Sequence, residues 1–169
     1  MRLISRIVLP AVGLALPLAF AAPSRTGPAG RQLQRSAMSS EILTSKKSPH
    51  SFDETVDRLE RAVRGAGATV FAKIDHAAAA SSVGSSLRPT TVLIFGNPKA
   101  GTPLMQHAQT LGLDLPLRVL VWRDEAGQVW LTYRDAAALA HEHGIEVGDA
   151  RLAPLAGALQ RFTDEATRP

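Results

Sequence analysis

Two apolar segments around a short turn constrain the fold of this chain more than any other feature of its sequence. Residues 117–122 (LRVLVW) and 128–133 (QVWLTY) are rich in β-branched and aromatic side chains, and they flank the turn residues 124–127 (DEAG). This pattern predicts a β-hairpin, in which Trp122 and Trp130 are candidate cross-strand partners. A hairpin pairs antiparallel strands, so the pattern favours an antiparallel sheet.

Three further strand-like segments precede this hairpin. Residues 69–74 (TVFAKI) are β-branched and aromatic, and a short strand is expected at 42–43. Residues 90–95 (TTVLIF) form a continuous apolar run, which is typical of a central strand covered on both faces.

Helix start signals stand between these strands. Ser51 and Glu54 form a capping box, in which the hydroxyl and the carboxylate each bind an unpaired backbone N–H group. Asp75 is expected to cap a short alanine-rich helix, and Thr102 to cap a helix with Pro103 at its first position. Helices are therefore predicted from Ser51 to about Arg64 and over 76–87, 102–111, 135–143 and 149–165.

The order of these segments predicts an α+β fold: a single domain with a mainly antiparallel sheet and helices packed on one of its faces. The chain of 169 residues shows no internal repeat. We divide it into a signal peptide (1–21), a disordered linker (22–40), a folded domain (41–148) and a C-terminal helix and tail (149–169).

The N-terminus has the features of a secretory signal. Arg2 and Arg6 precede the apolar residues 7–20, and Ala19-Phe20-Ala21 fits a cleavage site. A membrane anchor is the alternative, but this stretch is shorter than the roughly 20 residues that span a bilayer. We therefore expect cleavage after Ala21, a periplasmic or secreted protein, and no stable membrane insertion.

Composition excludes several classes of chemistry. The chain has no cysteine, which rules out disulfides, thiolate nucleophiles and thiolate zinc sites. A net charge of +4, from 19 basic and 15 acidic residues, does not indicate a nucleic-acid partner. No serine-hydrolase elbow or paired-carboxylate motif is present, and we expect no cofactor.

One long stretch resembles a known family. Residues 51–145 contain SFDETVDRLERAVRGAGATVFAKIDHAAAA, LRPTTVLIFGNPKAGTPLMQ, LDLPLRVLVWRDEAGQVWLTYRD and LAHEHGI. In the step 74–76 (IDH), the loop 95–99 (FGNPK) and the turn 115–117 (LPL), the chain resembles the domain of unknown function 302 family. The resemblance implies a layout similar to TATA-box-binding-protein-like α+β folds and usually a homodimer, with no known activity. The common family pattern has Asn where this chain has Arg134.

The loop from Gly96 to Thr102 (GNPKAGT) is the first candidate site. It joins a strand to a helix and has the two-glycine spacing of a phosphate loop, whose backbone N–H groups bind an anion. A true phosphate loop has Lys directly after the second glycine, whereas this chain has Thr102 there and Lys99 inside the loop. A small-anion site and a purely structural turn with a helix cap both remain open.

Two histidine motifs are further candidates. Asp75 next to His76 can act as a proton-transfer pair, or Asp75 caps a helix while His76 makes hydrogen bonds near Lys99 or a dimer partner. The run from His141 to His143 lacks the i, i+4 spacing that zinc sites on a helix require, so we expect a solvated helix end and no metal.

These observations predict an exported, homodimeric module that binds a small anionic or amphipathic molecule, or a protein partner, in a cleft near His76 and Lys99. An enzyme that uses Asp75 and His76 for proton transfer with Lys99 as anion anchor is one alternative, and a purely structural interaction domain is another. No catalytic residue is assigned. The candidate ligand-binding residues are Asp75, His76, Asn97, Lys99, Gly101 and Thr102.

Overall fold

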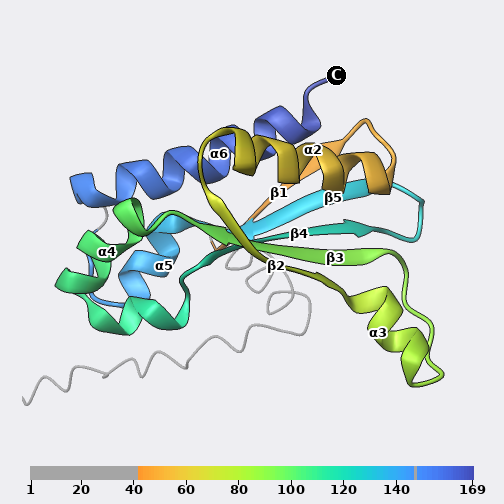
Figure 1. The fold of residues 1–169 in the computed structure, drawn as a ribbon, viewed down its shortest axis with the longest axis horizontal. Coiled ribbons are helices and arrows are strands. Elements are labelled where there is room, and N and C mark those ends of the chain that lie inside the picture. The colour runs from red at the N-terminus through yellow and green to blue at the C-terminus, as the bar shows by residue number, and fades with distance from the viewer. Residues whose placement is uncertain (1–41, 147) are drawn as a thin grey trace, which may run out of the picture.

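The computed structural model describes residues 42–146 and 148–169, which form one five-stranded sheet with helices packed against it (Figure 1). The strands are β1 (Leu43–Ser48), β2 (Thr69–Asp75), β3 (Thr90–Gly96), β4 (Leu117–Arg123) and β5 (Val129–Arg134). Their order in the sheet is β1-β5-β4-β3-β2, and every neighbouring pair is antiparallel. The prediction of a single α+β domain with an antiparallel sheet is confirmed.

Along the described chain, helices alternate with strands as far as β4, a turn connects β4 to β5, and two helices follow β5. The helices are α2 (Phe52–Gly65), α3 (His76–Ser82), α4 (Pro98–His107), α5 (Ala136–Glu142) and α6 (Ala153–Thr167), with 3₁₀ turns η1 (Gln109–Leu113) and η2 (Ala150–Leu152). None of the helices in the described ranges is long and apolar enough to cross a membrane.

The β4–β5 hairpin confirms the cross-strand pair that the sequence predicts. Trp122 lies opposite Trp130, and their rings are stacked at 6.2 Å with an interplanar angle of 18°. The Trp130 indole N–H donates to Asp124 Oδ2 at 2.8 Å, and this bond lowers the pKa of the Asp124 carboxyl. Asp124 thereby holds the turn and the second strand together.

Only one face of the sheet is covered by the long helices α2 and α6, which run side by side over it (Figure 1). Along β3, buried residues such as Leu93 and Phe95 alternate with half-buried ones such as Val92 and Ile94. The expectation that this strand is covered on both faces is therefore wrong. β3 is an interior strand, but its second face is apolar without a long helix on it in the described chain.

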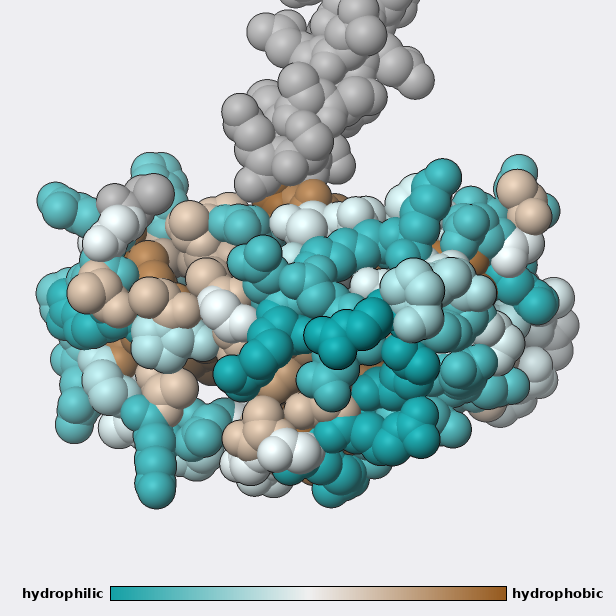
Figure 2. All heavy atoms as spheres, turned by 90° about the horizontal axis from the view of Figure 1, so that it is seen from above, coloured by the Kyte–Doolittle hydropathy of each residue, from teal (hydrophilic) through white to brown (hydrophobic). Residues whose placement is uncertain are grey.

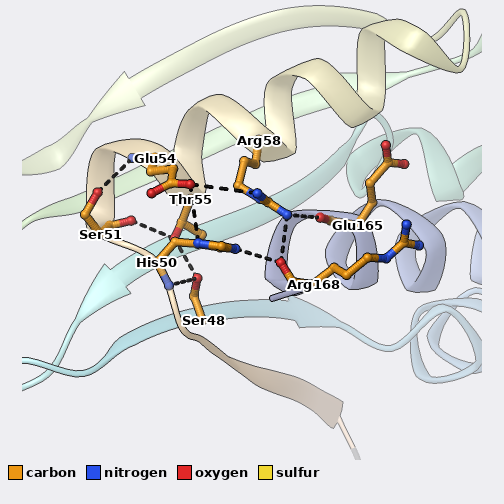
Figure 3. A network of polar contacts seen from close by, with 8 residues as sticks. All are labelled: Ser48, His50, Ser51, Glu54, Thr55, Arg58, Glu165 and Arg168. Carbon is orange, nitrogen blue, oxygen red and sulfur yellow. Dashed lines mark hydrogen bonds and ion pairs between the residues drawn. The ribbon is translucent and has the colours of Figure 1, made fainter.

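The C-terminal helix belongs to the same packed unit as the preceding domain. α6 buries Leu155, Leu159 and Phe162 in the common core. At its end, the carbonyl oxygen of Arg168 accepts a hydrogen bond from Arg58 of α2 at 2.7 Å and lies 2.7 Å from the His50 ring (Figure 3). Residues 149–169 therefore complete the sheet's helical layer.

The capping box at the start of α2 is formed only in part. Ser51 Oγ accepts a bond from the Glu54 N–H at 3.3 Å, as expected. The Glu54 carboxylate instead lies 3.3 Å from His50 and 3.8 Å from Arg58 (Figure 3). The carboxylate therefore points toward these two side chains and not toward the backbone N–H of Ser51.

Several element boundaries differ from the prediction, among them the end of α4 at His107 and the start of α6 at Ala153. β1 runs to Ser48, because its backbone pairs with β5 as far as Ser48 opposite Val129. Its lysines also find partners: Lys46 lies 2.5 Å from Asp164, and Lys47 lies over the Trp130 ring. α3 ends at Ser82, five residues early, just before Gly84 turns the chain with a positive φ of 73°. α4 begins at Pro98, one turn before the expected cap.

α4 begins at a cap and a proline that precede Thr102 and Pro103 in the sequence. Asn97 Oδ1 accepts a bond from the Lys99 N–H at 3.0 Å, and Pro98 occupies the first helical position. Thr102 and Pro103 lie inside the helix. The prediction that Thr102 caps this helix is wrong, because Asn97 provides an equally good cap one turn earlier.

Candidate functional site

A pocket of about 310 Å³ opens at one end of the sheet. It lies between the C-terminal end of β3, the first turns of α4, the start of β4 and residues 154–162 of α6. Figure 2 looks at the molecule from above and shows tan and some brown, hydrophobic atoms among teal ones around a gap toward its left end, where Figure 1 places α4 and the start of α6. This pocket is the candidate functional site.

The pocket wall is mostly apolar. Its largest apolar side chains are Phe71, Phe95, Met105, Leu155 and Phe162. Phe95 and Phe162 meet edge to face, with ring centroids 5.7 Å apart, and so join the sheet to α6. Phe71 stands at the register shift between Val70 and Ala72, where a β-bulge redirects a side chain.

Two glycines of the pocket wall lie close to side chains of neighbouring segments. A Cβ atom at Gly96 would lie 3.5 Å from the Cβ of Pro116 and 3.6 Å from the Phe71 ring. At Gly101 it would lie 3.4 Å from a methyl group of Leu115. A side chain at either position would therefore extend toward the pocket and narrow it.

The loop that resembles a phosphate loop has few free donors. The Lys99 N–H donates to the Asn97 side chain at 3.0 Å, and the N–H groups of Ala100 and Gly101 donate to the Asn97 carbonyl at 2.9 and 3.0 Å. A phosphate loop needs such groups to point at the ligand. The geometry therefore favours the interpretation of this loop as a turn with a helix cap.

The six predicted ligand residues divide into two groups. Asn97, Gly101 and Thr102 line the pocket, whereas the exposed Lys99 is not among its lining residues. Asp75 and His76 follow the opposite end of the β2–β3 pair, since Thr69 lies opposite Gly96 and Asp75 lies opposite Thr91.

Six residues of strand separate these two ends, which corresponds to roughly 20 Å. The expectation that His76 and Lys99 meet in one cleft is therefore wrong within a single chain. Asp75 acts as the N-cap of α3, because its Oδ1 accepts a bond from the Ala78 N–H at 2.9 Å. The capping interpretation of Asp75 is confirmed.

The structure also contains a polar cluster that the sequence did not predict. His143 has a side chain only 9% exposed, and its ring lies 2.7 Å from Asp114 and 3.0 Å from Thr110. Arg134 donates to Asp114 at 3.1 Å and also to Glu142, and the second bond raises the pKa of Arg134. The expectation of a solvated helix end is wrong for His143.

This cluster ties η1, β5 and α5 together. Asp114 is 29 residues from His143 in the sequence, so no local spacing could indicate the contact. Arg134 supplies the cation at its centre, because its guanidinium pairs with both Asp114 and Glu142. Within the described residues, no group of three histidine or acidic side chains could hold a metal ion.

The pocket residues of α6 were also missed as site residues. Pro154, Leu155, Ala158, Arg161 and Phe162 lie on the pocket side of this helix. Their spacing of three and four residues was visible, but it indicates only a buried helix face. Nothing in such a stripe distinguishes a wall of a cavity from ordinary core.

Comparison with known proteins gives relatives in sequence and in structure. The chain is 47% identical over 103 residues to the "Fluoride-specific ion channel FluC 1" of Brucella suis biovar 1 (strain 1330), a match that covers 61% of this chain and 41% of that protein. The "Fluoride-specific ion channel FluC 2" of Brucella melitensis biotype 1 is also 47% identical over 103 residues, and the match covers 38% of its length. The chain thus spans about two fifths of the length of these curated relatives.

A solved structure shares the fold. The "Crystal structure of uncharacterized conserved protein DUF302 from Bacillus stearothermophilus" matches with a TM-score of 0.67 at 17% identity, over 73% of this chain and 97% of that one. The family described as "Domain of unknown function DUF302" matches residues 44–164, from β1 into α6. Since this match takes in most of the chain and nearly all of its sheet and helical layer, the protein belongs to the DUF302 family.

Proposed function

We propose that this protein is an exported, homodimeric module that binds a small amphipathic molecule in the pocket between β3, α4 and α6. The pocket volume of about 310 Å³ carries the proposal. Sites for small molecules typically measure roughly 300–1,000 Å³ and are apolar with a few polar groups. Binding fits the pocket better than catalysis, because its lining residues in the described chain include no acid–base pair.

The enzyme alternative loses its main support. It required Asp75, His76 and Lys99 in one site, and the strand register separates the first two from the third. The Asp75 carboxylate is used as a helix cap.

The proposed export rests on the signal features of residues 1–21, which lie outside the described residues.

The proposed dimer rests on the sheet face opposite α2 and α6. There Val92, Ile94, Leu120, Trp122 and Trp130 form a continuous, half-buried apolar surface across three neighbouring strands. Contiguous apolar surface of this kind marks interaction sites.

A pair of tryptophan substitutions on α6 tests the pocket. Ala158→Trp fills the cavity from its α6 wall, whereas at the neighbouring Gly157 an added Cβ meets no atom within 4 Å. We expect the wild type and Gly157→Trp to bind the neutral probe 1-octanol in ligand-observed NMR, and Ala158→Trp to lose that signal. Circular dichroism checks that both variants are folded. Equal octanol binding by the two variants would show that the pocket is not the site.

A second candidate function comes from the named relatives. More than half of each fluoride-channel relative lies outside the match with this chain. Their shared segment suggests that this domain works in association with a fluoride channel, which is then its protein partner.

Growth in fluoride tests this second candidate. We expect a host strain that lacks the gene to grow more slowly than its parent in sodium fluoride and equally well in sodium chloride. A plasmid copy of the gene should restore growth in fluoride. Identical growth of the two strains in both salts would exclude a role in fluoride handling.

A further inference from the structure

We infer that the ligand of the pocket is a small amphipathic anion whose headgroup is held by Arg161 of α6. This inference rests on the proposed function, and it names the chemical class of the ligand. Arg161 was not among the residues that the sequence singled out.

The charge of the pocket lining favours an anionic ligand. Arg161 is the only charged residue among the pocket's lining residues, and no described acidic side chain lines the pocket. A ligand group beside Arg161 therefore meets a positive charge without a competing negative one. An anion is favoured there, and a cation is disfavoured.

The Arg161 guanidinium is available to bind a ligand. Its guanidinium makes no hydrogen bond or ion pair with residues 42–146 or 148–169, and Arg161 is exposed. The group lies 5.0 Å from the centroid of the Phe162 ring, which forms part of the pocket wall. A guanidinium in this place can donate two parallel N–H bonds to a carboxylate without giving up a protein partner.

The rest of the wall defines the other end of the ligand. Phe71, Met105, Leu155 and Phe162 offer apolar surface, and the flexible thioether of Met105 adapts to irregular shapes. At roughly 30 Å³ for each water molecule, the cavity of about 310 Å³ has the volume of about ten waters. A short alkyl chain or a single ring with one acidic group fits this size.

The test uses three probes with the same tail and different headgroups: octanoate, 1-octanol and octylammonium. We expect the wild type to bind octanoate about tenfold more tightly than octanol, as a charge-assisted hydrogen bond provides. Octylammonium should bind more weakly than octanol. Titration calorimetry at low and high salt measures these affinities, and salt should weaken only the octanoate complex.

Two variants assign the effect to one cation. Arg161→Gln should weaken octanoate binding about tenfold and leave octanol binding within about twofold of the wild type. Lys99→Gln is the matched control, because it removes a charge from the first turn of α4, next to the pocket, without changing a lining residue. It should leave both affinities unchanged. Arg161→Lys should restore part of the preference for octanoate, since it keeps the charge but not the planar fork.

The outcomes separate this inference from the proposed function. Equal affinity of the wild type for octanoate and octanol, or equal weakening by Lys99→Gln and Arg161→Gln, would overturn the role of Arg161 while the pocket remains a binding site. Failure of every probe to bind the wild type would overturn both. A preference for octanoate that disappears only in Arg161→Gln supports the inference.

Discussion

Phe95→Ala should lower the free energy of unfolding by about 3–5 kcal/mol, the range measured when a large aromatic side chain is removed from a core. Phe95 is 1% exposed in the interior strand β3, and its ring packs edge to face on Phe162 of α6. The substitution removes apolar burial and leaves a cavity between the sheet and α6. That cavity would join the pocket already present there.

Phe71→Ala is the matched control for this substitution. Phe71 lines the same pocket, but it is 55% exposed at the β2 bulge. Its removal should cost less than about 1 kcal/mol, because exposed side chains add little to stability. Urea denaturation followed by circular dichroism measures both variants. A loss for Phe71→Ala as large as that for Phe95→Ala would contradict the assignment of Phe95 to the core.

The sheet was predictable because its signals are local. The hairpin turn and the paired tryptophans lie within a few residues of one another, and they predict β4 and β5 as antiparallel neighbours without knowledge of distant contacts. The start of α4 was predicted wrongly because local signals alone could not decide it. Asn97 with Pro98 and Thr102 with Pro103 are equivalent local signals, and only the packed fold selects the first.

The site was less predictable because distant contacts form it. The pocket needs the end of β3 beside Arg161 and Phe162 of α6, more than 60 residues away in the sequence. From the sequence alone His143 is predicted to be a solvated helix end. Its contact with Asp114 forms only in the folded chain, where the turn before β4 lies beside α5. His76 and Lys99 follow the two ends of the β2–β3 strand pair, and only the strand register shows that these ends lie apart.

Leu120→Glu should convert the proposed homodimer into a monomer. Leu120 is half-buried on β4, between Val92 of β3 and Thr132 of β5, on the sheet face opposite α2 and α6. In a two-fold dimer each substituted residue occurs once in each copy. Two carboxylates would then be desolvated in an apolar interface, a cost that the nearby Arg118 and Arg134 offset only in part, which should raise the dissociation constant at least about a hundredfold.

Val83→Glu is the control for this last substitution, since it adds the same charge at an apolar residue that is 76% exposed after α3. Sedimentation velocity over a range of concentrations should give a dimer for the wild type and Val83→Glu and a monomer for Leu120→Glu. Thermal unfolding should confirm that each variant is folded. Because the open sheet face and the pocket lie on different parts of the fold, Leu120→Glu should still bind octanoate. A wild type that sediments as a monomer, or a Leu120→Glu protein that stays dimeric, would exclude this face as the dimer interface.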